Sequence, residues 1–174
     1  MNPEVSRSAK IMVLVEDAES GFQFYQNLVG MERCISAGGN AKVYSKLVEA
    51  SGTEKVLVVA DGAAFGPYID KVVKYAELKG NVGLYFPESF EWMILRSGIL
   101  EDHGIADILN EPYSFIDSTE HVSWERFFTA LLMEVTKGDS VRRYSKSKLS
   151  DYYMGKKSTD RIVNVMPEEI RDLL

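Results

Sequence analysis

The chain has 174 residues and a mass of 19.6 kDa, enough for one compact core with an appendage and short for two full domains. Its 20 Lys and Arg against 26 Asp and Glu give a net charge of −6, which excludes a uniformly basic nucleic-acid coat or membrane-surface protein. Its longest apolar runs have five residues, far below the roughly 20 of a membrane span, and the single Cys34 permits no internal disulfide. A cytoplasmic protein without membrane contact is therefore expected.

Four short apolar segments alternate with helical patterns in the first hundred residues. The predicted strands are 10–15, 33–36, 55–60 and 82–86. Helical spacing follows each of them, as in Ile69, Val72, Val73 and Ala76, and Gly30 and Gly80 are expected to end helices. Asn40 is expected to cap another. This alternation predicts an α/β, Rossmann-like parallel sheet of about four strands with helices on both faces.

From about residue 100 the pattern is helical only. A stripe that includes Phe127, Phe128, Leu131 and Leu132 is expected to pack against the sheet domain, and Pro167 to start a short last helix. We therefore predict an α/β domain over 1–115 and a helical C-terminal extension over 116–174.

Acidic residues and glycines follow the predicted strands, where a parallel sheet binds ligands. The candidates are Glu16, Asp17, Gly38, Gly39, Asp61 and Glu88. Carboxylates gathered on one rim favour Mg²⁺ or Mn²⁺, and a glycine pair lets backbone amides approach a phosphate. The alternative is that these acids only cap helices and keep the strand ends soluble.

Four segments in this order resemble the Toprim domain of bacterial primases and OLD-type nucleases. The segments are VLVEDAESGFQFYQNL (13–28), ISAGGNAKVYSKL (35–47), KVLVVADGAAFGP (55–67) and VGLYFPESFEWMIL (82–95). The resemblance implies a divalent-metal-dependent nuclease in which Glu16 acts as general acid or base and Asp61 holds Mg²⁺. It also implies a separate ATPase chain as a partner.

The chain departs from the Toprim pattern where the second Asp of the Asp-x-Asp motif would stand, because that residue is Ala63. Asp17 or Glu88 could replace the lost ligand, which keeps a weakened nuclease open. The other interpretation is a non-catalytic module that binds protein or nucleic acid. A receiver-like phosphoacceptor at Asp61 ranks third, since the Ser or Thr and the Lys that such domains need are missing from the expected strand ends.

The segment 137–161 holds eight basic and three acidic residues, so its charge is +5 and the rest of the chain carries −11. Its candidate nucleic-acid contacts are Arg142, Arg143, Lys146 and Lys148. Tyr144, Tyr152 and Tyr153 lie between the charges and could stack on bases. The alternative is a solvated helical face or a surface for an acidic protein partner.

Overall fold

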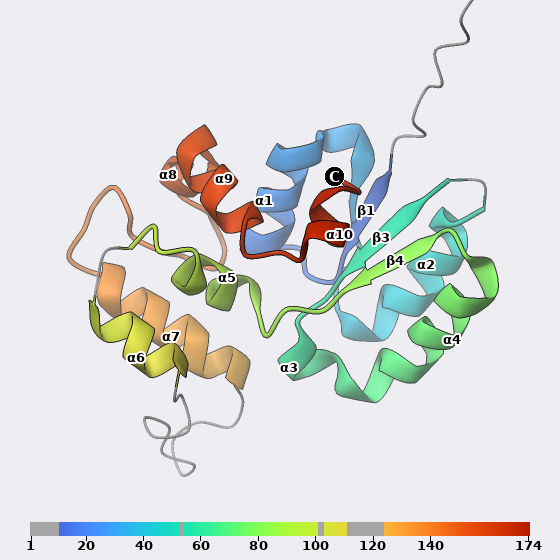
Figure 1. Ribbon diagram of the computed structural model, residues 1–174, viewed down its shortest axis with the longest axis horizontal. Helices are drawn as coiled ribbons and strands as arrows, with labels where there is room; N and C mark the ends of the chain where they lie inside the picture. Colours follow the sequence, from blue (N-terminus) through green and yellow to red (C-terminus); the bar gives the residue numbers. More distant parts are fainter. Residues whose placement is uncertain (1–10, 53, 101–102, 111–123) are drawn as a thin grey trace, which may run out of the picture.

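The computed structural model describes residues 11–52, 54–100, 103–110 and 124–174 (Figure 1). A four-stranded sheet in the order β2-β1-β3-β4 lies at its centre, and all three strand pairs are parallel. The strands are β1 (Met12–Val15), β2 (Cys34–Ser36), β3 (Val56–Val59) and β4 (Val82–Tyr85). The predicted α/β fold with a parallel sheet is confirmed.

Alternating strand residues divide the core into two layers, one on each face of the sheet. Leu14 and Val58 pack with helices α2 (Val43–Ala50) and α4 (Ile69–Lys79), on the face that Figure 1 shows to the right. Val13 and Leu57, which pair across β1 and β3, pack on the opposite face with α1 (Ser20–Val29) and α5 (Phe90–Arg96). Both faces are therefore covered, which explains strands that are apolar throughout.

Most predicted element ends agree with the structure. Gly30 and Gly80 end α1 and α4 with φ of 95° and 68°, a left-handed region open to glycine. The capping prediction for Asn40 is wrong, because Asn40 begins a 3-10 turn (Asn40–Lys42) that precedes α2. Two unpredicted short elements, α3 (Gly62–Phe65) and a 3-10 turn (Gly66–Tyr68), follow β3.

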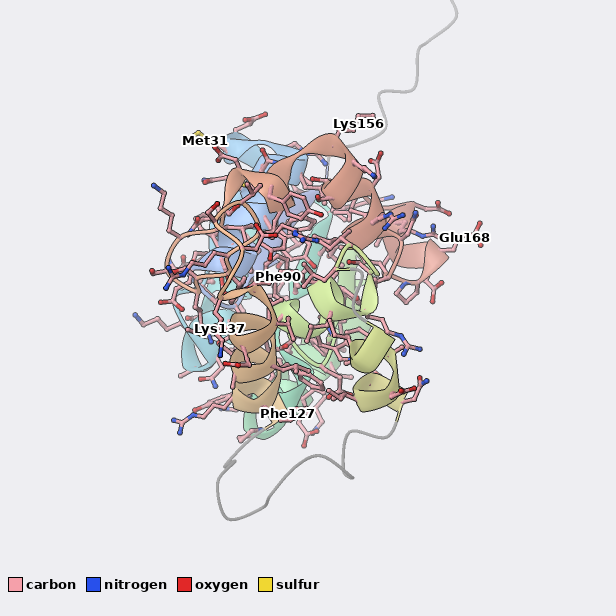
Figure 2. All side chains as sticks on the ribbon, turned by 90° about the vertical axis from the view of Figure 1, so that its left-hand side faces the viewer. Met31, Phe90, Phe127, Lys137, Lys156 and Glu168 are labelled. Carbon is pink, nitrogen blue, oxygen red and sulfur yellow. The ribbon has the colours of Figure 1, made fainter. Side chains whose placement is uncertain are left out.

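The C-terminal residues share the α1 side of the core, and their described part contains helices and the loop that joins α7 to α8. The elements are α6 (His103–Asn110), α7 (Trp124–Thr136), α8 (Asp151–Met154), α9 (Lys156–Val163) and α10 (Glu168–Arg171). The α7 stripe packs as predicted, with Phe127, Phe128 and Leu132 buried beside α5, and Figure 2 shows Phe127 below Phe90. The predicted 115/116 boundary lies outside the described residues. No helix within them is both long and apolar enough to cross a membrane.

A polar stripe on α1 binds the backbone of the C-terminal extension. Ser20 donates its N–H to the carbonyl of Lys146 at 2.9 Å. Gln23 donates to the Ser147 carbonyl and accepts the N–H of Leu149, each at 2.9 Å, and Asn27 donates to the Met154 carbonyl at 3.1 Å. The spacing of 20, 23 and 27 puts the three side chains on one helix face. This face is therefore a docking surface for residues 146–154.

A buried hydrogen-bond chain joins the extension to two helices. The Tyr144 hydroxyl donates to the carboxyl of Glu91 on α5 at 2.6 Å, and it lies 2.7 Å from the Ser20 hydroxyl of α1. The three residues are at most 2% exposed. Since the Tyr144 proton goes to Glu91, the Ser20 hydroxyl donates to Tyr144. Burial, and then the nearby Glu91 carboxyl, raise the pKa of Tyr144 well above its usual range.

We expect Tyr144→Phe to lower the free energy of unfolding by roughly 1–3 kcal/mol, because it leaves buried polar groups on Glu91 and Ser20 without a partner. Urea denaturation followed by circular dichroism measures the change. Tyr44→Phe is the matched control, since Tyr44 is 40% exposed and its hydroxyl makes no hydrogen bond to a described residue. Equal midpoints for the two variants would contradict the role of Tyr144.

Candidate functional site

Two of the predicted acids meet at the switch point of the sheet. The chain leaves β1 for β2 on one side and returns to β3 on the other, so Glu16 and Asp61 follow adjacent strands. Such a point is where doubly wound sheets bind ligands. A hollow there has Glu16, Asp17 and Asp61 in its wall, but its volume is about 10 Å³. That is close to the space of one water molecule.

Aromatic and apolar side chains fill the rest of this switch point. Tyr25 of α1 and Phe90 and Met93 of α5 complete the wall of the hollow, and the Tyr25 hydroxyl donates to the Met93 sulfur at 3.6 Å. Gly62, directly after Asp61, donates its N–H to the carbonyl of Pro87 at 2.6 Å. A Cβ on Gly62 would stand 3.0 Å from the Phe86 carbonyl oxygen and 3.1 Å from that of Pro87. The loops after β3 and β4 are therefore packed tightly together.

The carboxylate of Asp17 accepts hydrogen bonds from the backbone at the start of α1. Its Oδ1 accepts the N–H of Phe22 at 2.9 Å and that of Glu19 at 3.2 Å, which satisfies two groups of the first helical turn. Gly21 makes room for this carboxylate, since a Cβ there would lie 2.9 Å from Asp17 Oδ2. Burial raises the pKa of Asp17 above 3.8, while the two backbone hydrogen bonds and the charge of Lys146 act in the opposite direction.

The backbone N–H groups of the glycine turn after β2 are hydrogen-bonded to neighbouring residues of the rim. Gly38 donates its N–H to the Ser36 hydroxyl at 3.0 Å, and Gly39 donates to the Glu16 carbonyl at 2.8 Å. The Ser36 hydroxyl in turn donates to the Asp17 carbonyl at 2.5 Å. The turn needs glycine, with φ of 72° at Gly38 and 120° at Gly39. These two amides hold the rim together and are not presented to a phosphate.

The predicted Mg²⁺ or Mn²⁺ ligands do not form a fitting donor set. Glu88 is exposed on the loop after β4 and lies outside the hollow that Glu16, Asp17 and Asp61 share. Within the described ranges, no group of three or more His, Cys, Asp or Glu side chains is arranged so that it could hold a metal ion. A hard divalent cation takes about six oxygen ligands, several of them waters in the case of Mg²⁺, and a hollow of about 10 Å³ does not hold the ion together with its waters. Asp17 Oδ1 is in addition engaged by α1.

Ionisable groups near the switch point favour their neutral forms. Burial raises the pKa of Tyr25 well above 10, and it raises the pKa of Tyr85 to about 12. Burial also raises the pKa of the Cys34 thiol to about 12, so this cysteine carries no thiolate for nucleophilic chemistry at neutral pH. Cys34 is 3% exposed and is a small buried side chain of the core.

The basic segment splits into buried anchors and exposed charges. Tyr144 and Tyr153 are 2% and 0% exposed, so neither ring is available to stack on a base. Arg142 pairs with Asp139 at 2.5 Å. Arg143 and Lys148 are exposed and make no ion pair or hydrogen bond through their side chains to any described residue. Lys146 lies near enough to Asp17 for its charge to lower the pKa of that carboxyl.

Three residues of a second hollow were not among the sequence-predicted sites. Lys157, Ser158 and Arg161 line a space of about 510 Å³ at the start of α9. Two features of the sequence point to them: Gly155 precedes a helix that begins with Lys-Lys-Ser, and Lys157 and Arg161 are four residues apart on one helix face.

Searches of family models, curated proteins and solved structures found no match to this chain.

We expect Asp17→Ala to lower the free energy of unfolding by about 1 kcal/mol, the usual cost of a lost helix cap. Asp17→Asn keeps the acceptor oxygen and removes a buried charge, so it should lose less than Asp17→Ala at pH 7. Because the pKa of Asp17 is raised, the wild type gains stability relative to Asp17→Asn as the pH falls from 7 through that pKa. Thermal melts at pH 7 and pH 4 measure both effects, and a constant difference between wild type and Asp17→Asn would contradict the second.

Proposed function

We propose that this chain is a Toprim-like module that binds nucleic acid through its basic C-terminal segment and does not hydrolyse it. The contacts are Arg142, Arg143, Lys146 and Lys148 on the loop between α7 and α8. The acids of the sheet rim then serve the fold. An ATPase on a separate chain stays a prediction of the Toprim resemblance.

The observation behind this proposal is that the loop buries its Tyr144 ring and exposes the charged side chains of Arg143 and Lys148. Tyr144 anchors the loop in the core, and hydrogen bonds from α1 hold its backbone, so the loop has a fixed path. On that path Arg143 and Lys148 are exposed and have no acidic partner among the described residues. Unpaired cations on an ordered backbone suit phosphate contacts, which position a nucleic acid without reading its sequence.

The absence of hydrolysis is supported by the rim. A phosphodiester and its metal would need space between Glu16 and Asp61, and the hollow there has about 10 Å³. Asp17 faces the helix N–H groups, and the glycine amides are bonded within the rim. The position of the second motif Asp is Ala63, within α3. Each of these features favours binding without catalysis over the weakened nuclease.

We expect single-stranded DNA to bind with an affinity that falls steeply with salt, because binding releases counterions from the phosphates. Arg143→Glu with Lys148→Glu should weaken binding at least tenfold and flatten the slope of log K against log salt by about 0.7 per lost contact. Fluorescence anisotropy of a labelled oligonucleotide measures both quantities.

Lys71→Glu with Lys74→Glu is the matched control, since it makes the same charge change on exposed residues of α4, across the sheet from α1. This control should shift affinity by much less than the loop variant. Equal weakening by both pairs would show that only net charge matters, and it would contradict a site on the α7–α8 loop.

Metal-dependent cleavage gives a second test. At roughly 5–10 mM Mn²⁺ or Mg²⁺, we expect the wild type to nick plasmid DNA no faster than Glu16→Gln or Asp61→Asn. The reason is that the described carboxylates lack a fitting donor set for the metal. Isothermal titration of Mn²⁺ should give no saturable binding. Nicking that is lost in both variants, with saturable Mn²⁺ binding, would restore the nuclease interpretation.

A further inference from the structure

The second hollow of the molecule lies where α8 meets α9 and has a volume of about 510 Å³, within the range of small-ligand sites. It is distinct from the sheet rim and shares only Arg142 with the proposed nucleic-acid loop. Figure 2 shows Lys156, the first residue of α9, at the upper end of the molecule. Four basic side chains and one acidic side chain line the hollow: Arg142, Lys156, Lys157, Arg161 and Asp151.

The start of α9 presents free backbone donors to this space. Gly155 is the N-cap residue and has no side chain with which to accept a helix N–H. The first intrahelical bond is the one from the Thr159 N–H to the Gly155 carbonyl, at 2.9 Å. The N–H groups of Lys156, Lys157 and Ser158 therefore donate to no acceptor among the described residues. Uncapped N–H groups and the helix dipole together attract an anion.

The side chain of Ser158 gives an independent indication of a ligand. Ser158 is 4% exposed and lines the hollow, yet its side chain makes no hydrogen bond in the described part of the chain. The hydroxyl is reached from the hollow, so water contacts it when the hollow is empty and a ligand oxygen can replace that water. A ligand oxygen in the hollow would satisfy it, together with the backbone N–H of the same residue.

The side chains around this position supply both charge and an apolar wall. Arg161 donates Nη1 to the Gly98 carbonyl at 2.9 Å, which holds its guanidinium beside the hollow and leaves other N–H groups for a ligand. Lys157 is exposed and makes no ion pair with a described residue. Tyr152, whose hydroxyl donates to the Ile99 carbonyl at 3.2 Å, and Ile99 itself form the less polar side.

We propose that this hollow binds a phosphate monoester, with the phosphate against the N-terminus of α9 and the remainder of the ligand against Tyr152 and Ile99. A terminal phosphate offers three oxygens, which matches three free N–H groups, the Ser158 hydroxyl and the charge of Lys157. A bridging phosphodiester offers only two unesterified oxygens. The aromatic ring of Tyr152 and the side chain of Ile99 offer a wall on which a base can pack, so the ligand class to test is a nucleotide, either free or as the 5′-phosphorylated end of a nucleic acid.

The test uses the full chain and compares 5′-AMP, inorganic phosphate and adenosine by isothermal titration. We expect 5′-AMP to bind and to raise the melting temperature, phosphate to bind more weakly, and adenosine to have no effect. Lys157→Ala should weaken 5′-AMP binding about tenfold and Ser158→Ala about fivefold, as expected for one charge-assisted and one neutral hydrogen bond. Lys71→Ala, on exposed α4, should leave it unchanged.

Comparing oligonucleotides with and without a 5′-phosphate shows whether the site binds nucleic-acid ends or free nucleotides. A preference for the 5′-phosphorylated strand that is lost in Lys157→Ala assigns the site to nucleic-acid ends, and 5′-AMP binding without that preference assigns it to free nucleotides. Equal binding of 5′-AMP and adenosine, or affinities unchanged in both Lys157→Ala and Ser158→Ala, would overturn the proposal. These outcomes are independent of the Arg143 and Lys148 variants, which test the proposed function. Because Lys157 is exposed, its variant retains the fold even if Ser158→Ala does not.

Discussion

The hydrogen bond from Tyr144 to the Glu91 carboxyl determines where the C-terminal extension lies. A carboxyl that is 1% exposed requires a polar partner, and residue 144 must therefore return to α5 from the far end of α7. Once it is seated, Ser20 and Gln23 of α1 can bind the backbone that follows. The positions of α8 and α9, and with them the hollow at Gly155, depend on this contact together with the hydrogen bonds from α1 and the burial of Tyr153 and Ile162 in the core.

The rim of the sheet illustrates a second constraint, the need to satisfy backbone groups at element ends. Asp17 accepts the first N–H groups of α1, and the Glu16 carbonyl accepts the N–H of Gly39. These bonds close the place where doubly wound sheets usually hold a ligand. At α9 the opposite holds, because Gly155 offers no side-chain cap and the helix N–H groups stay open. Local capping thus distinguishes a structural helix start from one able to bind an anion.

Sequence patterns were sufficient for the sheet and insufficient for the partners of polar residues. Apolar runs and glycines such as Gly30 and Gly80 marked strands and helix ends, since these depend on local burial and backbone conformation. The basic neighbours of Tyr144 predict a stacking residue, while its acceptor Glu91 lies 53 residues away in the sequence and gives no local signal. Ser20, Gln23 and Asn27 likewise resemble a solvated helix face, and only the fold shows the backbone they bind. Asp17 could be placed on the rim from sequence, but its orientation toward α1 could not.

The two unlike charge regions of the chain are coupled through the same anchor. The net charge of −6 averages +5 over residues 137–161 and −11 elsewhere, and an acidic rim would repel a phosphate backbone held nearby. Seating Tyr144 brings Lys146 to the start of α1, where its charge lowers the pKa of Asp17 against the effect of burial. Exposed charges are screened beyond about 8–10 Å at physiological salt, so a cation at this short range offsets the rim locally. The buried Glu91–Tyr144 contact therefore acts on electrostatics as well as on packing: it sets one basic residue against the acids and leaves Arg143 and Lys148 free to face solvent.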